Sequence, residues 1–214
     1  MTPTSTAQKI ARRTGLLAAA ASLALMVAPA SGLAAAPVKF GAKLDPTVQP
    51  SNSLPGLPCN QESLVACTMV QNEAYGRPDG GELAPRSGTI KKIRLIAGGP
   101  GTFRLQVAKV KRSTLFGSNE AKVVANGQKI RYQGQTEANW ESDSYRIETF
   151  DVNVPVKKGQ QLAMHTNGTP MSAIRCSSGG DNTLIYQGGL KLRQPFKPAT
   201  DTDGCWILME AVIR

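Results

Sequence analysis

Apolar and polar residues alternate along much of the chain with a period of two, which is the pattern of half-buried β-strands. In residues 102–111, Phe103 and Leu105 share one face, and Arg104 and Gln106 share the other. Stretches rich in Gly and Pro separate these runs and indicate turns and loops. We predict strands in ten segments: residues 38–44, 64–71, 89–97, 102–111, 128–135, 148–156, 161–166, 172–176, 183–187 and 205–214.

Two segments depart from simple alternation. Residues 118–127 are the one stretch that we predict to be a short helix, with Ser118 as its cap. Residues 205–214 are apolar on both faces except at Glu210, which is typical of a central strand or of a strand at a seam between sheets. Many short strands separated by turns predict an all-β fold, an antiparallel β-sandwich with a jelly-roll-like topology.

The N-terminus has the three parts of a secretory signal peptide. A positive region contains Lys9, Arg12 and Arg13, and an apolar stretch and small residues follow it. The pattern predicts cleavage after Ala30 or Ala34, and therefore a secreted, extracellular protein. The apolar stretch is too short to span a bilayer as a helix. An uncleaved membrane anchor and twin-arginine export are the alternatives that the pattern leaves open.

The chain divides into three predicted parts: a signal peptide over residues 1–34, an N-terminal strand with a Pro-rich extended segment over 35–58, and a β-sandwich domain over 59–214. Removal of the signal would leave 22 of the 25 basic residues against 15 acidic ones, a formal charge of +7. Such a basic protein attracts anionic partners. We expect no membrane contact after cleavage, and the sequence does not indicate an oligomeric state.

Four cysteines follow the predicted signal: Cys59, Cys67, Cys176 and Cys205. An even number behind an export signal predicts two disulfides, for which three pairings exist. We favour the pairing of nearest neighbours, Cys59 with Cys67 and Cys176 with Cys205. These spacings do not fit a zinc site, which needs close cysteine pairs and usually histidine. We therefore expect no metal and no cofactor.

The stretch RCSSGG places Ser177 and Ser178 beside glycines, as in the nucleophile loop of serine proteases. A serine nucleophile needs a general base, and the chain has one histidine, His165. A hairpin beyond His165 would set it opposite Ile174 rather than the serines, on a face that alternation assigns to solvent. We predict no catalytic residue here and interpret residues 179–182 as a turn.

Acidic residues offer a second route to catalysis. Glycosidases hold two carboxylates about 5–9 Å apart, and the nearest pairs in sequence are Glu141 with Asp143 and Glu148 with Asp151. The second pair would face opposite ways on one strand, because its members are separated by an odd number of residues. A secreted glycan-active hydrolase that uses loop carboxylates is the alternative function.

Two loops resemble ligand sites but are better explained as turns. Residues 98–102 are glycine-rich, but they lead into a strand, whereas a phosphate loop leads into a helix. Asp201 and Asp203 could ligate calcium, yet the residues after them do not follow the EF-hand pattern. We predict a turn at each position.

Five basic residues fall at outward positions of three successive strand segments: Lys92, Arg94, Arg104, Lys129 and Arg131. If these strands are neighbours, the side chains form one positive patch that would attract an anionic polymer. A plain solvated face is the alternative. Because few aromatic residues accompany the basic ones, we expect no nucleic-acid partner.

Trp140 and Tyr145 stand among polar residues in the loop 137–145. Exposed aromatic rings stack on sugars in many sugar-binding sandwiches, which is an argument by analogy. Our candidate ligand-binding residues are therefore Trp140 and Tyr145, together with Arg104, Lys129 and Arg131. The alternative for the two aromatic residues is that they anchor a partly buried loop.

Several motifs occur together: GTIKKIRLIAGGPGTFRLQVAK, RYQGQ, FDVNVPVKKGQQLAM, RCSSGG, DGCWILMEAV and the cysteine pair before EAY. In this combination the chain resembles a group of secreted bacterial proteins of uncharacterised function. The resemblance implies export, a β-sandwich and two disulfides, and it implies no activity. We expect an exported β-sandwich that is not an enzyme and that binds an extracellular carbohydrate or an anionic wall polymer.

Overall fold

The computed structural model describes residues 36–51, 59, 66–113, 118–135, 144–168, 171–176 and 180–214. The predicted signal peptide lies outside these residues. The described chain contains strands and loops and no helix, and all its strand ladders are antiparallel. The prediction of an all-β, sandwich-like fold is confirmed.

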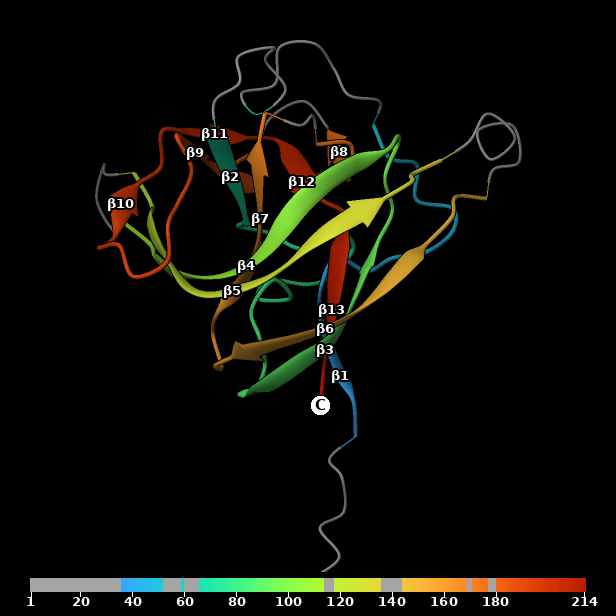
Figure 1. Cartoon of the computed structure of the whole chain (residues 1–214), viewed down its shortest axis with the longest axis horizontal. Coiled ribbons are helices and arrows are strands. Elements are labelled where there is room, and N and C mark those ends of the chain that lie inside the picture. The colour runs from blue at the N-terminus through green and yellow to red at the C-terminus, as the bar shows by residue number, and fades with distance from the viewer. Residues whose placement is uncertain are drawn as a thin grey trace, which may run out of the picture. The chain divides into compact units, whose positions relative to one another are not determined.

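Four strands form one sheet, in the spatial order β1-β13-β3-β6 (Figure 1). Their bounds are β1 Val38–Gly41, β13 Met209–Ile213, β3 Gly88–Leu95 and β6 Glu148–Val156. In this sheet the first and the last strand of the described chain are neighbours, with Val38 opposite Ile213.

Seven strands form a second sheet, in the order β10-β5-β4-β7-β2-β9-β11, and Figure 1 shows the strong curvature of β4 and β5. Their bounds are β10 Lys197–Pro198, β5 Glu120–Tyr132, β4 Gly101–Lys111, β7 Gln161–Asn167, β2 Ala66–Gln71, β9 Thr183–Gln187 and β11 Asp201–Asp203. A small third sheet pairs β8 Ile174–Cys176 with β12 Cys205–Ile207.

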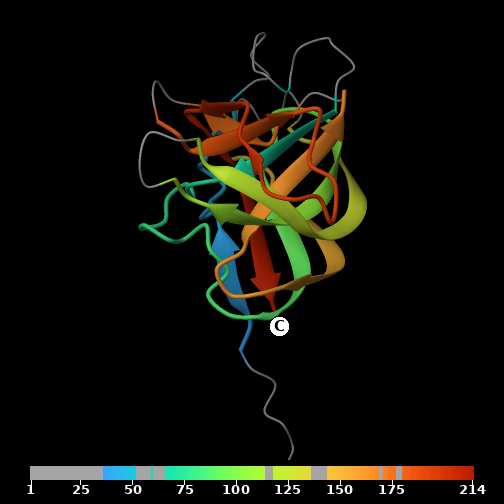
Figure 2. The same cartoon turned by 90° about the vertical axis from the view of Figure 1, so that its left-hand side faces the viewer.

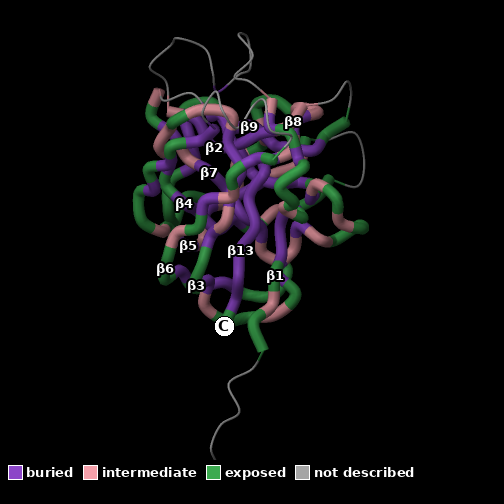
Figure 3. Tube along the Cα trace, turned by 90° about the vertical axis from the view of Figure 1, so that its right-hand side faces the viewer, coloured by how far each residue is buried: buried purple, intermediate pink, exposed green. Residues whose placement is uncertain are grey.

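The main hydrophobic core combines the inward faces of both large sheets. The four-stranded sheet contributes Ile90, Ile93, Leu95, Val152, Val154, Ala211 and Ile213. The seven-stranded sheet contributes Phe103, Leu105, Val107, Ile130, Leu162, Met164 and Ile185. Most of these positions follow the period of two, which is why the sequence pattern identified them. β3 departs from it, because a register shift between Ile90 and Lys92 leaves both Ile90 and Ile93 in the core. Figure 3 shows the buried positions concentrated along the strands.

A second apolar cluster lies on the outer face of the seven-stranded sheet: Val70, Ala108, Ala121, Val123, Ala163, Leu184, Tyr186 and Leu190. Leu190 belongs to the segment between β9 and β10, and Leu192 of the same segment forms a bridge with Val123. In Figure 2 this orange-red segment crosses in front of the yellow-green strands. The segment therefore covers one part of the outer face and excludes water from it.

The predicted helix over residues 118–127 is wrong, because these residues contain the first half of β5, which pairs with β4. A register shift opposite Val107 and Ala108 changes the face of the sheet on which the β5 side chains lie. Val123 is buried in the outer cluster, whereas Ala125, two residues later, is buried in the main core. Such a bulge interrupts the alternation that identifies a strand in sequence. Pairing with the long β4 outweighs the weak local preference for helix.

The predicted turn at Asp201 and Asp203 is also wrong, because these residues form β11 and pair with β9. Asp203 Oδ1 accepts a hydrogen bond of 3.1 Å from the backbone N–H of Cys205. In the described part of the Pro-rich segment, residues 45–51 run over the surface, and Val48 packs with Tyr145 and Leu208.

A buried carboxylate binds three basic side chains on the outer face of the four-stranded sheet. The Glu210 side chain on β13 is 3% exposed, and Arg94 of β3 donates to it at 2.6 Å. Arg77, from the loop after β2, donates at 2.8 Å, and Lys39 of β1 lies at 3.3 Å. Glu210 thus connects both neighbouring strands and one loop, which explains the single charge in an otherwise apolar strand.

The two disulfides join the pairs that we predicted, Cys59 with Cys67 and Cys176 with Cys205. The first attaches the start of β2 to the preceding segment. The second connects β8 and β12 at directly opposite positions. No cysteine in the described chain is free. Two disulfides are typical of extracellular proteins.

We predict that Glu210→Gln destabilises the protein by about 2–3 kcal/mol, because a hydrogen bond to a charged group contributes about 1.5–3 kcal/mol. Urea denaturation followed by circular dichroism measures the change. The matched control is Glu120→Gln, whose partner Lys111 is 70% exposed, and which should cost less than about 0.5 kcal/mol. Equal losses for the two variants would contradict the role assigned to Glu210.

We predict about zero free thiols per mature chain in a titration under denaturing, non-reducing conditions. Reduction should lower stability, since closing loops of these lengths contributes about 2.6 and 3.6 kcal/mol in the chain-entropy model. Peptide mapping checks the pairing. Two or more thiols per chain, or a peptide that joins Cys59 to Cys176 or Cys205, would refute it.

Candidate functional site

The five basic residues of the predicted patch do not lie on one face. Lys92 and Arg94 belong to β3 in the four-stranded sheet. Both are engaged there, Lys92 with Asp151 at 3.6 Å and Arg94 with Glu210. The condition for a single patch fails because β3 and β4 follow each other in sequence but belong to different sheets.

The other three basic residues do come together, on β4 and β5 of the seven-stranded sheet. Arg104 on β4 is opposite Lys129 on β5, and Thr102 on β4 is opposite Arg131 on β5. Neighbouring strands are about 4.8 Å apart, and alternate residues of one strand about 6.6 Å apart. The three charged side chains therefore start from backbone positions within about 8 Å of one another.

Two hollows lie beside these residues. The larger has a volume of about 490 Å³, and its lining residues are Pro100, Gly101, Thr102, Lys129 and Arg131. The smaller has a volume of about 220 Å³, and its lining residues are Thr102, Phe103, Arg104, Lys129, His165, Thr166 and Asn167. Because the two share Thr102 and Lys129, we describe them together as the basic groove. It occupies the part of the sheet that the segment after β9 does not cover.

The three cations of the groove have no carboxylate partner. In the described part of the chain, no Asp or Glu oxygen lies within 4.0 Å of a side-chain nitrogen of Arg104, Lys129 or Arg131. Arg104 Nη1 donates to the Gly127 carbonyl oxygen at 3.3 Å. The positive charge of the groove is therefore not neutralised by a fixed partner there.

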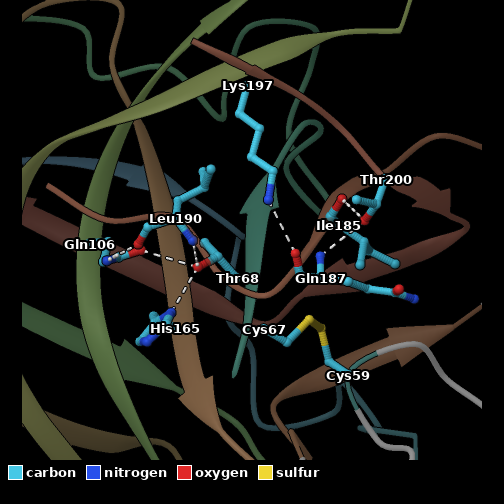
Figure 4. The surroundings of a disulfide bond; sticks show 10 residues. All are labelled: Cys59, Cys67, Thr68, Gln106, His165, Ile185, Gln187, Leu190, Lys197 and Thr200. Carbon is cyan, nitrogen blue, oxygen red and sulfur yellow. Dashed lines mark hydrogen bonds between the residues drawn. A yellow bond between two sulfur atoms is a disulfide. The ribbon is translucent and has the colours of Figure 1, made fainter. Parts of the chain in front are cut away.

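A polar cluster borders the groove (Figure 4). Thr68 Oγ1 of β2 lies 2.9 Å from His165 Nδ1 of β7 and accepts a hydrogen bond of 2.9 Å from the backbone N–H of Leu190. The Gln106 side-chain amide donates to the Leu190 carbonyl oxygen at 3.1 Å and to Asn126 Oδ1 at 3.0 Å. The cluster ties the covering segment to three strands and separates the covered part of the sheet from the groove.

His165 is half-buried between the polar cluster and the groove, which corrects our prediction that it faces solvent opposite Ile174. It pairs with Arg104 on one side and Thr68 on the other, because β7 lies between β4 and β2. Burial lowers the pKa of His165 below its ordinary 6.5; a hydrogen bond to Asn167 acts in the opposite direction, and the nearby Arg104 charge lowers it further. His165 is therefore neutral at pH 7.

The described acidic candidates, Glu148 and Asp151, do not form a catalytic pair. Glu148 is buried and accepts hydrogen bonds from the backbone N–H groups of Gln133 and Gly134, so it holds a loop. Asp151 is exposed and faces Lys92. The two carboxylates thus point to different surroundings, as the odd spacing predicted. Glu141, Asp143 and the two serines of the RCSSGG stretch lie outside the described residues.

The aromatic part of the predicted ligand site is not supported. Tyr145 is 6% exposed and packs in a small apolar cluster with Val48, Ile96 and Leu208. A ring in that position cannot offer its face to a sugar, so the alternative of a loop anchor applies to Tyr145. Trp140 lies outside the described residues.

Comparisons of the chain with protein-family models, with curated proteins and with solved structures found no match. The resemblance to a group of secreted bacterial proteins therefore stays a prediction, apart from the all-β fold and the two disulfides. No helix in the described segments is long and apolar enough to cross a membrane. Within the same segments, no group of three or more His, Cys, Asp or Glu residues is placed to hold a metal ion.

Sequence reasoning identified the cations of the groove but missed its neutral residues. Asn167 and His165 join Arg104 and Lys129 only because β7 pairs with β4, and no local motif indicates that pairing. Thr102 lies on β4 itself, two residues before Arg104. One signal in the sequence could have indicated the neutral part of the groove: the single histidine is followed by the polar residues Thr166 and Asn167 at the end of a predicted strand.

We predict that Gly189→Ala destabilises the protein by about 1–2 kcal/mol more than Gly188→Ala. Both glycines have positive φ, +71° and +77°, so both variants carry the same backbone penalty. A Cβ at Gly189 would lie 2.6 Å from His165 Cε1, whereas one at Gly188 would meet nothing within 4 Å. Urea denaturation gives both values. Equal destabilisation would mean that the covering segment does not pack tightly on His165.

Proposed function

We propose that this protein binds a linear anionic polymer along the basic groove. The observation that carries the proposal is that Arg104, Lys129 and Arg131 line two connected hollows with no carboxylate partner in the described chain. Arginine and lysine in a fixed array attract polyanions and accelerate their encounter with the protein. A polymer with repeated negative groups can contact several of these cations at once, so that weak contacts add up.

The location supports an extracellular polymer. The N-terminal sequence has the pattern of an export signal, and the two disulfides suit an oxidising compartment. We therefore propose that the protein is exported and meets its polymer outside the cytoplasm. An anionic wall polymer fits this setting and the charge of the groove. The charge of the groove favours such a polymer over a neutral sugar. The burial of Tyr145 points the same way, because its ring was a candidate for stacking on a sugar and is not accessible.

Binding without catalysis is the form of the proposal that the geometry favours. Hydrolysis of a glycan by the usual route needs two carboxylates that flank the scissile bond. The described lining of the basic groove consists of basic and neutral side chains. Glu148 and Asp151, the described members of the acidic pairs, are engaged elsewhere.

The test is retention of the mature protein on an immobilised anionic wall polymer at 0.1 M and 1 M salt. The Debye length falls from about 10 Å to about 3 Å over that range, so retention should fade. The double variant Arg104→Glu/Arg131→Glu should bind at least about thirtyfold more weakly at 0.1 M, since each cation near an anionic surface contributes about 1 kcal/mol.

Lys157→Glu/Lys158→Glu is the matched control. It makes the same change in net charge, on exposed residues of the turn between β6 and β7. This control should lose much less affinity than the groove variant. Equal losses would show that net charge alone drives retention, and equal retention of wild type and groove variant would refute the groove as the binding site.

A further inference from the structure

The smaller hollow of the basic groove is surrounded by hydrogen-bond donors from three strands. Arg104 and Thr102 come from β4, Lys129 from β5, and His165 and Asn167 from β7. Among the described residues, no acidic side chain lines this hollow. These residues therefore offer a compact ligand donors from several directions and no competing negative charge.

We propose that the smaller hollow is a subsite for one tetrahedral oxyanion group of the polymer, a phosphodiester or a sulfate ester, and that His165 takes up a proton as this group binds. The inference rests on the proposed function and specifies its ligand class and its dependence on pH. It makes His165 a binding residue rather than a base in catalysis.

The directions of the donors favour a tetrahedral group. A carboxylate presents two oxygen atoms in one plane, and a bidentate arginine satisfies both. Here Arg104, Lys129 and His165 are on three different strands around the hollow. A group with oxygen atoms in three or four directions can accept from all of them at once.

The surroundings of His165 allow it to be neutral or protonated without losing a hydrogen bond. In the neutral tautomer that carries its proton on Nε2, Nδ1 can accept from the Thr68 hydroxyl, whose oxygen lies 2.9 Å away. In the protonated ring, Nδ1–H donates to the same oxygen, and the Thr68 hydroxyl hydrogen can turn to Gln106 Oε1, at 3.4 Å. Protonation thus requires only a rotation of one hydroxyl.

Charges around the ring determine the sign of the pH effect. The facing charged groups in the described chain are Arg104 of β4 and Lys129 of β5; β2 brings Thr68, and the covering segment brings Gly189 and Leu190. In the free protein, burial first and then the Arg104 charge hold the His165 pKa below 6.5. A bound anion opposes both effects and raises this pKa, so binding takes up a proton and tightens as the pH falls.

Nuclear magnetic resonance tests the proposal directly, because His165 is the single histidine of the chain. The probes are dextran sulfate and poly(glycerol phosphate), whose groups keep their charge between pH 5 and 8. The imidazole titration should have its midpoint below 6.5 in the free protein and at least about one pH unit higher with either probe. An unchanged midpoint under saturating probe would overturn the role of His165.

Affinity gives a second readout, with His165→Gln as the variant. Wild-type affinity for dextran sulfate should rise about tenfold from pH 8 to pH 5, which corresponds to a shift of about one unit in pKa. His165→Gln, checked for folding by circular dichroism, should bind with nearly constant affinity over this range. A variant that keeps the tenfold change would overturn the proposal.

A carboxylate polymer distinguishes the ligand class. Polygalacturonate, compared at equal charge concentration and salt, should bind at least about tenfold more weakly than both tetrahedral probes at pH 6. Equal affinity would refute the tetrahedral subsite while leaving the proposed function intact. If none of the three polymers binds at any pH, the proposed function itself fails. A preference for only one of the two tetrahedral probes identifies which ester the subsite accepts.

Discussion

Each strand of this protein has two faces, and the shared core can bury only one of them. This constraint determines the rest of the structure. In the four-stranded sheet, the second face is held by Glu210 with Lys39, Arg77 and Arg94. In the seven-stranded sheet, the segment after β9 covers a second apolar cluster and leaves the neighbouring part open. The basic groove is that open part.

The border between the covered and the open part explains why the groove combines charge with rigidity. Thr68 Oγ1 accepts a hydrogen bond from the Leu190 backbone N–H, and the Gln106 side-chain amide donates to the Leu190 carbonyl oxygen, so both side chains hold the covering segment in place. His165 contacts this border on one side and the groove on the other. A ligand there meets side chains whose positions are already set, which lowers the entropic cost of binding.

Local patterns in the sequence predicted what depends on a single strand. The alternation at Phe103 and Leu105 identified core positions, and the count and spacing of cysteines predicted both disulfides. The failures share a cause, which is strand pairing that no single segment reveals. Pairing with its sequence neighbour β4 made β5 a strand instead of a helix. β3 and β4 pair with different partners, so Arg94 and Arg104 belong to different sheets, and the pairing of the distant β7 with β4 brought His165 beside Arg104. No local pattern contains that information.

The pairing of β1 with β13 has a consequence for the order of folding. These strands lie at opposite ends of the described chain, so Lys39 can contact Glu210 only after the whole chain between them has been synthesised. Contacts between distant segments are slow to form, because the loop that joins them must first lose its freedom. The four-stranded sheet therefore cannot close until β13 has been synthesised. Until then β3 lacks its neighbour on one side, and Arg94 lacks the carboxylate that it binds in the finished sheet.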